Sequence, residues 1–357
     1  MKTLSKLQQL SFIIQREFLA ISTSYAVLLV LIGGIFVYGL LYNYMYAPNI
    51  VTDVPIAIVD NSHSELSRNF IRWLDATPQA DVYSQAMDYN EAKEWMKRGK
   101  VQGILSRVML AINDKYRPDE AVFLPPQGLL AVTMAKPINV EGTALYNYTE
   151  GYGSYLIPAV MMIIIFQTLL MVIGMVTGEE YSSDGIRTYA PFGHTWAAAI
   201  RIVAGKAFVY CGLYAIFSFF LLGLLPYFFS IPNIGNGLYI VLLMIPYLIA
   251  TSFLGLAASR YFTDSEAPLL MIAFFSVGLI FLSGVSYPME LMPWYWKAAH
   301  YILPAAPATL AFVQLNSMGA SMADIRPEYI TLWIQVLVYF ILSIWVYQKK
   351  LQKSQLR

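Results

Sequence analysis

AFVYCGLYAIFSFFLLGLLPYFFSIPNIGNGLYIVLLMIPYLIATSFLGLAAS, residues 207–259, contains no Asp, Glu, Lys or Arg. A helix needs about 20 apolar residues to cross the hydrocarbon layer of a membrane, so this stretch is long enough for two crossings. Its middle, PNIGNG at 232–237, is rich in residues that favour turns. The stretch therefore predicts a hairpin of two membrane-spanning helices at 207–226 and 238–258.

Four other stretches of the chain are similarly apolar and long. Across the chain, 58% of the residues are hydrophobic and only 13% are charged, which differs from the composition of an ordinary soluble domain. A charged residue at the centre of a spanning helix costs roughly 2.5–3.5 kcal/mol, so charge-free lengths place the helices. They predict further spans at 23–46, 154–177, 268–286 and 328–347. The expected fold class is an α-helical integral membrane protein with six transmembrane helices.

Lysine and arginine are distributed unequally between the two sides of these spans. Most of those in short loops and tails fall on one side, against only Lys297 and Arg326 in the short segment on the other. Short cytoplasmic loops carry an excess of Lys and Arg. We therefore expect a multi-pass protein of the bacterial inner (cytoplasmic) membrane, with both termini, including the tail 348–357, in the cytoplasm.

The N-terminal segment 1–22 has an amphipathic pattern. Apolar residues recur in it at helical spacing, whereas polar residues fill the positions between them. Such a segment predicts a cytoplasmic helix that lies at the membrane interface, and the alternative is a plain extension of the first span. The apolar residues of this pattern are Leu4, Leu7, Leu10, Ile14 and Phe18.

The segment 47–153 is the only sizeable polar part of the chain, and the orientation places it outside the cytoplasm. Runs of β-branched residues alternate in it with helical patterns, which predicts an inserted extracytoplasmic α/β domain. The expected elements are strands at 55–60, 81–84 and 101–105, a helix opened by Ser62 and Glu65, and a second helix at 91–98.

A second extracytoplasmic segment, 287–327, combines aromatic residues with prolines. Trp294, Tyr295, Trp296 and Tyr301 suit the interface between lipid and water, and the prolines break regular helices. We expect this segment to be re-entrant or interfacial, with short helices that enter the membrane without crossing it.

Two pairs of small residues have the four-residue spacing that lets spanning helices approach closely. They are Gly174 with Gly178 and Gly255 with Ser259. The two pairs therefore indicate either close packing of helices or a chance occurrence, since such spacings are common.

Several chemistries lack the residues that they need. Gly205 and Lys206 are adjacent, but the earlier glycine and the following Ser or Thr of a phosphate-binding loop are missing. The three histidines are far apart and Cys211 is the single cysteine, so we assign no metal site and no disulfide. The net charge of +1 gives no footprint for nucleic acid. We expect no catalytic residue, and ATP hydrolysis would require another chain.

The segment 178–206 is the most informative loop. Charge returns abruptly after a clean span, and the chain turns apolar again at 191–199, which suits a short helix docked on a partner. An ordinary cytoplasmic loop is the alternative. The residues that mark the segment are Glu179, Glu180, Asp184, Gly185, Arg187, Pro191, Arg201 and Lys206.

Two further segments carry recognisable patterns. One is VPIAIVDN at 54–61, followed by LSR at 66–68, and the other surrounds the last two spans. The latter contains Ser283, Gly284, Pro288, Pro293, Trp294 and Pro304. Together with the loop at 178–206, these segments resemble the type-2 ABC transporter permease family, in particular exporter permeases with a large extracytoplasmic domain between the first two transmembrane helices.

The resemblance implies a permease subunit that moves a hydrophobic or amphipathic substrate out across the inner membrane. ATP and magnesium would be bound by a separate ATPase and no cofactor by this chain, and 178–206 would be the loop that couples the two. The implied partners are cytoplasmic ABC ATPase subunits, a second permease chain in a homodimer or heterodimer, and membrane lipid. A periplasmic adaptor protein is a further candidate, and nucleic acid is not expected.

The resemblance also implies a substrate pathway beside the second and fifth spans. Candidate lining residues are Met162, Phe166, Gln167, Met271, Phe275 and Ser276, and the alternative for each is packing against other helices or lipid. Two other classes of protein compete with the permease. One is a membrane-anchored sensor or assembly factor that uses its extracytoplasmic domain for binding, and the other is a membrane-embedded enzyme.

Overall fold

The computed structural model describes residues 5–45, 54–60, 65–76, 80–98, 100–101, 103–105, 152–183, 185–229, 231, 233–287 and 289–356. The chain divides into two compact units. Unit 1 comprises Met1–Asn49 and Leu145–Arg357, and unit 2 comprises Ile50–Ala144.

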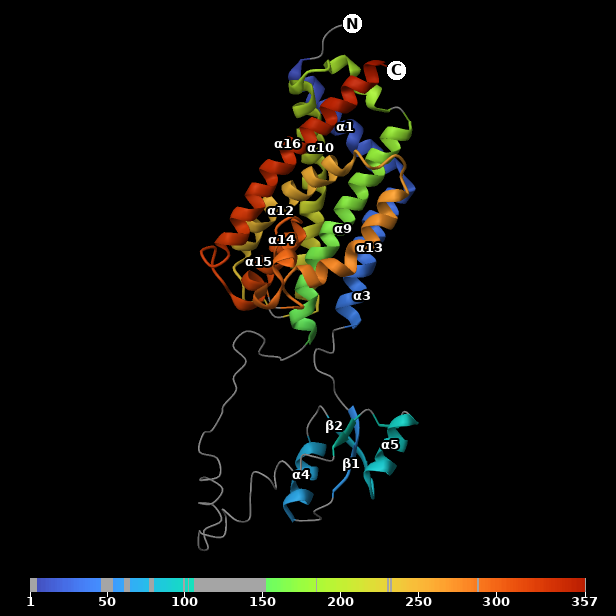
Figure 1. Cartoon of the computed structure of the whole chain (residues 1–357), viewed down its shortest axis with the longest axis vertical. Helices are drawn as coiled ribbons and strands as arrows, with labels where there is room; N and C mark the ends of the chain where they lie inside the picture. The colour runs from blue at the N-terminus through green and yellow to red at the C-terminus, as the bar shows by residue number, and fades with distance from the viewer. Residues whose placement is uncertain are drawn as a thin grey trace. The chain divides into compact units, whose positions relative to one another are not determined.

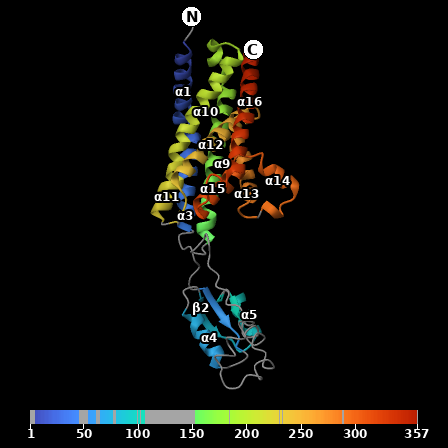
Figure 2. The same cartoon turned by 90° about the vertical axis from the view of Figure 1, so that its left-hand side faces the viewer.

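Helix α9 (Tyr152–Ser182) is the central helix of unit 1 (Figures 1 and 2). It packs against α10 (Trp196–Phe219), α12 (Gly237–Ala258), α13 (Ala267–Leu282) and α15 (Ala305–Met318). In its most apolar window, 83% of the residues are buried, whereas the other candidate spans bury 28–61%. A helix that is apolar on every side is stable where other helices surround it, and α9 meets that condition.

The N-terminal helix α1 (Lys6–Thr23) precedes the first span. The Ser5 side chain accepts a hydrogen bond from the Gln8 amide at 3.3 Å, and the Gln8 side chain accepts one from the Ser5 amide at 2.9 Å. This reciprocal cap fixes the start of the helix. Ser24 is extended and breaks the helix close to the predicted boundary. The span continues as α2 (Tyr25–Leu28), the π-helix η1 (Leu29–Val37) and α3 (Tyr38–Met45).

The hairpin predicted from the charge-free stretch is present. Helix α10 continues through the π-helix η3 (Phe220–Leu224) and α11 (Leu225–Phe228) before the chain turns into α12. The Asn236 side chain accepts a hydrogen bond from the Leu238 amide at 2.9 Å and caps α12. Asn is a preferred residue both in turns and at the N-terminal cap of a helix, so its use here agrees with its intrinsic preferences.

The C-terminal third differs from the expected arrangement. Helix α13 has 16 residues, about 24 Å at 1.5 Å per residue, which is short of the roughly 30 Å hydrocarbon layer. It ends before Gly284, whose φ of 82° favours glycine. After η4 (Met289–Leu291), α14 (Trp294–His300) and α15 follow, bent by 84° at their junction, and α16 (Arg326–Leu356) completes the unit.

The number of spans among the described residues is five, or six if the bent pair α14 and α15 counts as one. Helix α13, which forms most of the predicted span at 268–286, is left out of this count because it has only 16 residues, so a span there stays a prediction. The bent pair lies within the segment 287–327, where we expected a re-entrant or interfacial structure.

The segment 178–206 is not a loop throughout. Helix α9 extends to Ser182 and α10 begins at Trp196, so both ends of the segment are helical. Between them lies the 3-10 helix η2 (Gly185–Phe192), which shares only residues 191–192 with the short helix expected at 191–199; the rest of that stretch is a bend and the start of α10. The helices extend beyond the apolar lengths because charged residues at their ends find partners there.

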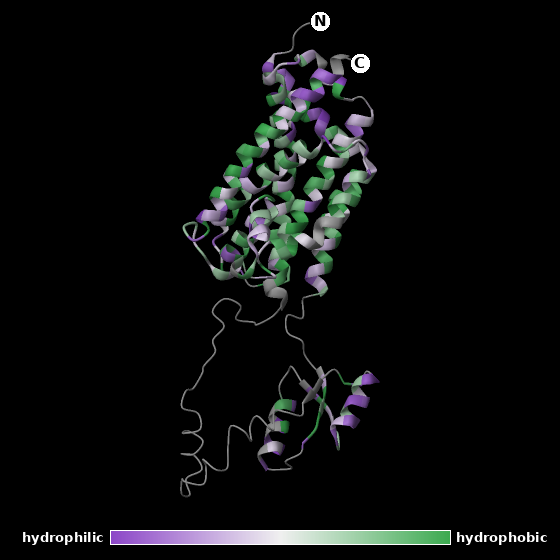
Figure 3. Ribbon diagram, in the orientation of Figure 1, coloured by the Kyte–Doolittle hydropathy of each residue, from purple (hydrophilic) through white to green (hydrophobic). Residues whose placement is uncertain are grey.

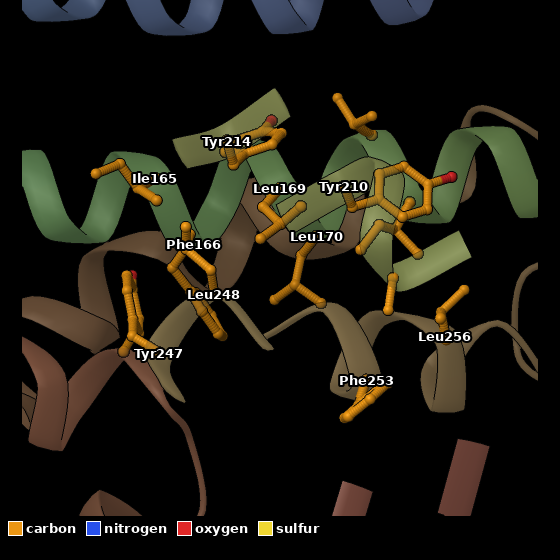
Figure 4. Close-up of a cluster of buried hydrophobic side chains, with 14 of the residues drawn as sticks. Ile165, Phe166, Leu169, Leu170, Tyr210, Tyr214, Tyr247, Leu248, Phe253 and Leu256 are labelled. Atoms are coloured by element: carbon orange, nitrogen blue, oxygen red, sulfur yellow. The ribbon is translucent and has the colours of Figure 1, made fainter. Parts of the chain in front are cut away.

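The hydrophobic core of unit 1 joins α9 to α10 and α12. Figure 4 shows Phe166 and Leu170 of α9 beside Leu248 and Phe253 of α12, with Tyr214 of α10 on the other side. In Figure 3, hydrophobic residues cover the middle of the bundle, and hydrophilic residues gather at the end where α1 and the C-terminal part of α16 lie. We call this the termini end of unit 1.

Both pairs of small residues lie at close helix contacts. A Cβ at Gly174 would lie 2.5 Å from Pro268 Cβ, and one at Gly255 would lie 2.9 Å from Ile173 Cδ1. Gly178 faces the Asp264 carbonyl so closely that no side chain fits. The close approach that the spacing indicated is therefore confirmed between helices of this one chain.

Unit 2 contains a three-stranded parallel sheet with strand order β2-β1-β3. Ala57, Val59, Ala86, Ala92 and Val101 form its small core with Trp95 packed against them. The described elements follow the expected order: β1 (Val54–Ile58), α4 (Glu65–Asp75), β2 (Ala80–Gln85), α5 (Tyr89–Lys97) and β3 (Gly103–Leu105). Ser62 and residues 106–151 lie outside the described part, so a domain over the whole of 47–153 stays a prediction.

Candidate functional site

A cluster of charged side chains, three of them buried and one half-buried, lies at the termini end of unit 1, where α1 meets α9 and α10. It consists of Arg16, Glu17, Glu180 and Lys206, and we call these four residues the ion network. Glu17 is 2% exposed and Lys206 is 1% exposed, which is rare for such side chains unless they are paired.

Glu17 connects α1 to α10. Its Oε2 accepts a hydrogen bond from Lys206 Nζ at 2.7 Å, and its Oε1 accepts one from the Tyr210 hydroxyl at 2.5 Å. Lys206 and Tyr210 are one helical turn apart on α10, so they meet the two carboxylate oxygens from the same face. Both oxygens of Glu17 are thereby satisfied inside the protein.

Glu180 connects the end of α9 to both cations. Its Oε1 accepts a hydrogen bond from Arg16 Nη1 at 3.1 Å, and its Oε2 lies 3.2 Å from Lys206 Nζ. Arg16 also donates from Nη2 to the Gly185 carbonyl at 2.8 Å, which ties α1 to the start of η2. Two cations and two carboxylates therefore neutralise one another across three helices.

Small residues allow this close packing. A Cβ at Gly205 would lie 2.8 Å from Ile13 Cγ2, and one at Gly185 would lie 2.8 Å from Arg16 Nη2. The buried face of α1 is formed by Gln9, Ile13, Glu17 and Ile21, four residues apart in turn. The predicted N-terminal helix is present, and this buried face packs it against the bundle.

The apolar residues that defined the predicted face of α1 differ in how exposed they are. Leu7 is 80% exposed and Phe18 is 57% exposed, while Leu10 and Ile14 are half-buried. Leu4 lies outside the described residues. The contact of these residues with the membrane interface stays a prediction, and the face that packs on the bundle is a separate one that contains Glu17.

Aromatic rings surround the cations of the ion network. The Arg16 guanidinium carbon lies 4.4 Å from the centroid of the Tyr189 ring, a favourable cation–π distance. Burial raises the pKa of the Tyr189 hydroxyl, which therefore stays neutral. Lys350 reaches the same region, 5.1 Å from the Tyr347 centroid, and donates to Ser259 Oγ at 2.9 Å.

The far end of η2 is held by α16. His194 Nδ1 lies 3.0 Å from the Leu351 carbonyl oxygen, and Gln348 Nε2 donates to the His194 carbonyl at 2.7 Å. Phe192 packs edge-on against Phe12 of α1, with ring centroids 5.9 Å apart. The short helix is consequently attached to α1 at its start and to both α1 and α16 at its end.

The residues that the sequence singled out in 178–206 divide into two groups. Glu180 and Lys206 are buried and belong to the ion network, whereas Glu179, Arg187 and Pro191 are exposed. Gly185 and Arg201 are half-buried, and Asp184 lies outside the described residues. We call the exposed group, Glu179, Arg187 and Pro191, the outer face of the segment.

The candidate pathway residues whose side chains the structure describes differ in their burial. Met162 and Phe166 are buried in the core of this chain, and the Tyr247 hydroxyl donates to the Met162 carbonyl at 2.7 Å. Gln167 is half-buried, and Met271 is 44% exposed. The side chains of Phe275 and Ser276 lie outside the described part.

The segment around Gly284 forms a compact corner after α13. Ser283 is buried and donates to the Ile280 carbonyl at 2.6 Å, while His300 Nδ1 lies 2.8 Å from the Leu282 carbonyl oxygen. Pro293 and Pro304 precede α14 and α15 directly, where a missing amide hydrogen costs least. Trp294 is 80% exposed, and Pro288 lies outside the described residues.

Sequence reasoning missed several members of the site: Glu17, Tyr189, Tyr210, His194 and Lys350. The signal for Glu17 was available, because it stands between Ile13 and Ile21 at four-residue spacing. An acid on an apolar stripe at the start of a membrane protein indicates a buried partner. The partner itself, 189 positions away, leaves no local pattern.

No group of three His, Cys, Asp or Glu side chains able to hold a metal ion occurs in the part of the chain that the structure describes.

The five or six apolar helices found among the described residues define a multi-pass helical membrane protein. A family model described as ABC-2 family transporter protein matches residues 17–345. The chain therefore belongs to the ABC-2 transporter family, as the resemblance predicted, and is a permease subunit of an ABC transporter. The family is a membrane component that associates with an ABC ATPase and is not itself the catalyst. No curated protein and no solved structure matches the chain.

Proposed function

We propose that this permease belongs to an exporter, and that the ion network transmits movement from a partner ATPase to the membrane helices. The observation that carries the proposal is the pairing of Glu180 and Lys206 with Arg16 and Glu17. These pairs join the central helix α9, the next helix α10 and the N-terminal helix α1 beside the 3-10 helix η2. The termini end of unit 1 would face the cytoplasm.

The outer face of the segment is the proposed contact for the ATPase. Glu179 is exposed near the end of α9, and Arg187 and Pro191 are exposed on η2 itself. A partner that binds there would push on a short helix held at both ends. Because the ion network is buried and paired, a displacement of η2 would move α1, α9 and α10 together. Binding of ATP by the partner would thereby shift the populations of inward-open and outward-open states.

The proposed substrate pathway lies beside α9 and α13. Gln167 and Met271 are the candidate lining residues that a substrate could reach, because Gln167 is only half-buried and Met271 is exposed. Met162 and Phe166 are better explained by core packing. We expect a hydrophobic or amphipathic substrate, ATP and magnesium on the ATPase, and a second permease chain across the membrane, with a periplasmic adaptor as a further candidate partner.

Site-directed photo-crosslinking tests the proposed contact. A photoreactive amino acid at position 187 or 191 should crosslink to the ATPase subunit in membranes, whereas one at position 297 should not. Position 297 is a matched control, because Lys297 lies in α14 and belongs to the predicted opposite side. Crosslinks from 297 but not from 187 or 191 would reject both the contact and the orientation. Recovery of the chain without any ATPase would favour a sensor or assembly factor.

A further inference from the structure

Two cations gather on one indole ring at the surface of α12 and α16. Lys349 Nζ lies 3.8 Å from the centroid of the Trp345 ring, and the Arg260 guanidinium carbon lies 5.4 Å from the same centroid. Lys349 and Trp345 are one turn apart on α16, whereas Arg260 follows the end of α12, which packs against α16. The tertiary fold, rather than sequence proximity, therefore brings the second charge to the ring.

These cations are not neutralised as those of the ion network are. Among the residues that the structure describes, neither Arg260 nor Lys349 lies within 4.0 Å of a carboxylate oxygen. The nearby Asp264 accepts hydrogen bonds from the amides of Glu266 and Ala267, and so caps the start of α13. Two like charges on one exposed ring favour the binding of an anion.

An exposed apolar strip on α16 leads to this point. Ile334, Val338 and Ile341 are 59%, 46% and 57% exposed, and Trp345, which is 37% exposed, continues their line. The spacing of three or four residues places all four on one face of the helix, with Lys349 next. The strip is apolar along its length and positively charged at its end, which is the complement of a phospholipid with an acidic headgroup.

We propose that Arg260, Lys349 and Trp345 bind the headgroup of an anionic phospholipid whose acyl chain lies along the α16 strip. Trp favours the level of the headgroups, and basic residues beside membrane helices attract anionic lipid by about 1 kcal/mol each. Of the two neighbouring lysines of α16, only Lys349 belongs to this site. Lys349 points outward to Trp345, whereas Lys350 points inward to Ser259.

Spin-labelled lipids test the proposal on the full chain in nanodiscs. The wild-type chain should retain spin-labelled phosphatidylglycerol in preference to phosphatidylcholine. The double variant Arg260→Gln/Lys349→Gln should lose most of this preference, at about five-fold per cation. The control Lys6→Gln/Lys297→Gln removes the same charge elsewhere and should keep it. Trp345→Leu, which retains both cations, should lower the preference less than the double variant.

Several outcomes would overturn the proposal. One is an unchanged preference in the Arg260→Gln/Lys349→Gln variant when its unfolding temperature matches that of the wild type. Another is an equal loss in the control, which would indicate a general effect of charge. Displacement of the lipid by inorganic phosphate would assign the cations to a soluble anion, and preferential binding of poly-glutamate would assign them to an acidic protein.

Discussion

Glu180 and Arg187 are seven positions apart, yet they lie in opposite surroundings. Glu180 is 7% exposed and paired with two cations, whereas Arg187 is exposed on the outer face of the same segment. Charged residues in this segment therefore serve two purposes. Buried charges fix the position of the helices, and exposed charges remain accessible to a partner subunit. Substitutions on the two sides should therefore have different kinds of effect.

The largest expected effect is on the buried side. Lys206→Met leaves the carboxylates of Glu17 and Glu180 without their shared cation, and breaking a buried pair costs about 3–5 kcal/mol. Thermal unfolding in detergent should show a markedly lower midpoint. The double variant Lys206→Met/Glu17→Gln should recover part of the loss, because one of the stranded charges is removed. Equal midpoints for the wild type and both variants would refute the structural role of the network.

A slightly smaller effect is expected where α9 meets the loop before α13. Gly178→Ala places a methyl group against the Asp264 carbonyl, and overpacking of this kind costs about 1–3 kcal/mol. Gly212→Ala is the matched control, because no heavy atom lies within 4 Å of the Cβ it would introduce. The control should unfold at or above the wild-type temperature, since Ala favours helices. The reverse order of the two variants would contradict the packing described.

The aromatic lining of the network gives a third, smaller effect. Tyr189→Leu removes the ring beneath Arg16 and should lower the free energy of unfolding by about 1–2 kcal/mol. Tyr189→Phe keeps the ring and should cost less. Chemical denaturation of both variants measures the difference. If the phenylalanine variant were the less stable of the two, the hydroxyl rather than the ring would be the important group.

The smallest effect on stability is expected on the outer face. Arg187→Gln should change the free energy of unfolding by less than about 1 kcal/mol, as is usual for exposed charges. Its effect should instead appear in binding, as weaker stimulation of the partner ATPase in proteoliposomes. Lys6→Gln, an exposed cation on α1, controls for loss of charge. An unfolding change as large as that of Lys206→Met would abolish the distinction between the two sides.

The sequence predicted the parts of the fold that depend on local composition. Charge-free length placed the hairpin of α10 and α12, and the order of strands and helices at 54–105 followed from local patterns. At 268–286 the helix ends earlier than the charge-free length indicates, because α13 stops at Leu282 before Gly284 and the bent pair α14 and α15 follows. Hydropathy does not report such a bend.

The candidate site was predicted in part. Glu180 and Lys206 were singled out, but as residues of a coupling loop rather than as buried partners. Their burial depends on Glu17, which approaches from a helix distant in sequence, and on Gly205, which lets Ile13 come close. Contacts of this kind are fixed by tertiary packing and have no periodic signature.

The separation of Glu17 from Lys206 has a consequence for biosynthesis. Because the two residues are 189 positions apart, α1 leaves the ribosome long before its counter-charge in α10 is made. Until then, the Glu17 carboxylate must stay hydrated at the membrane surface. Closure of the pair therefore marks the moment at which α1 has packed against α10, and a nascent chain that stops before α10 leaves the Glu17 carboxylate without its buried cation.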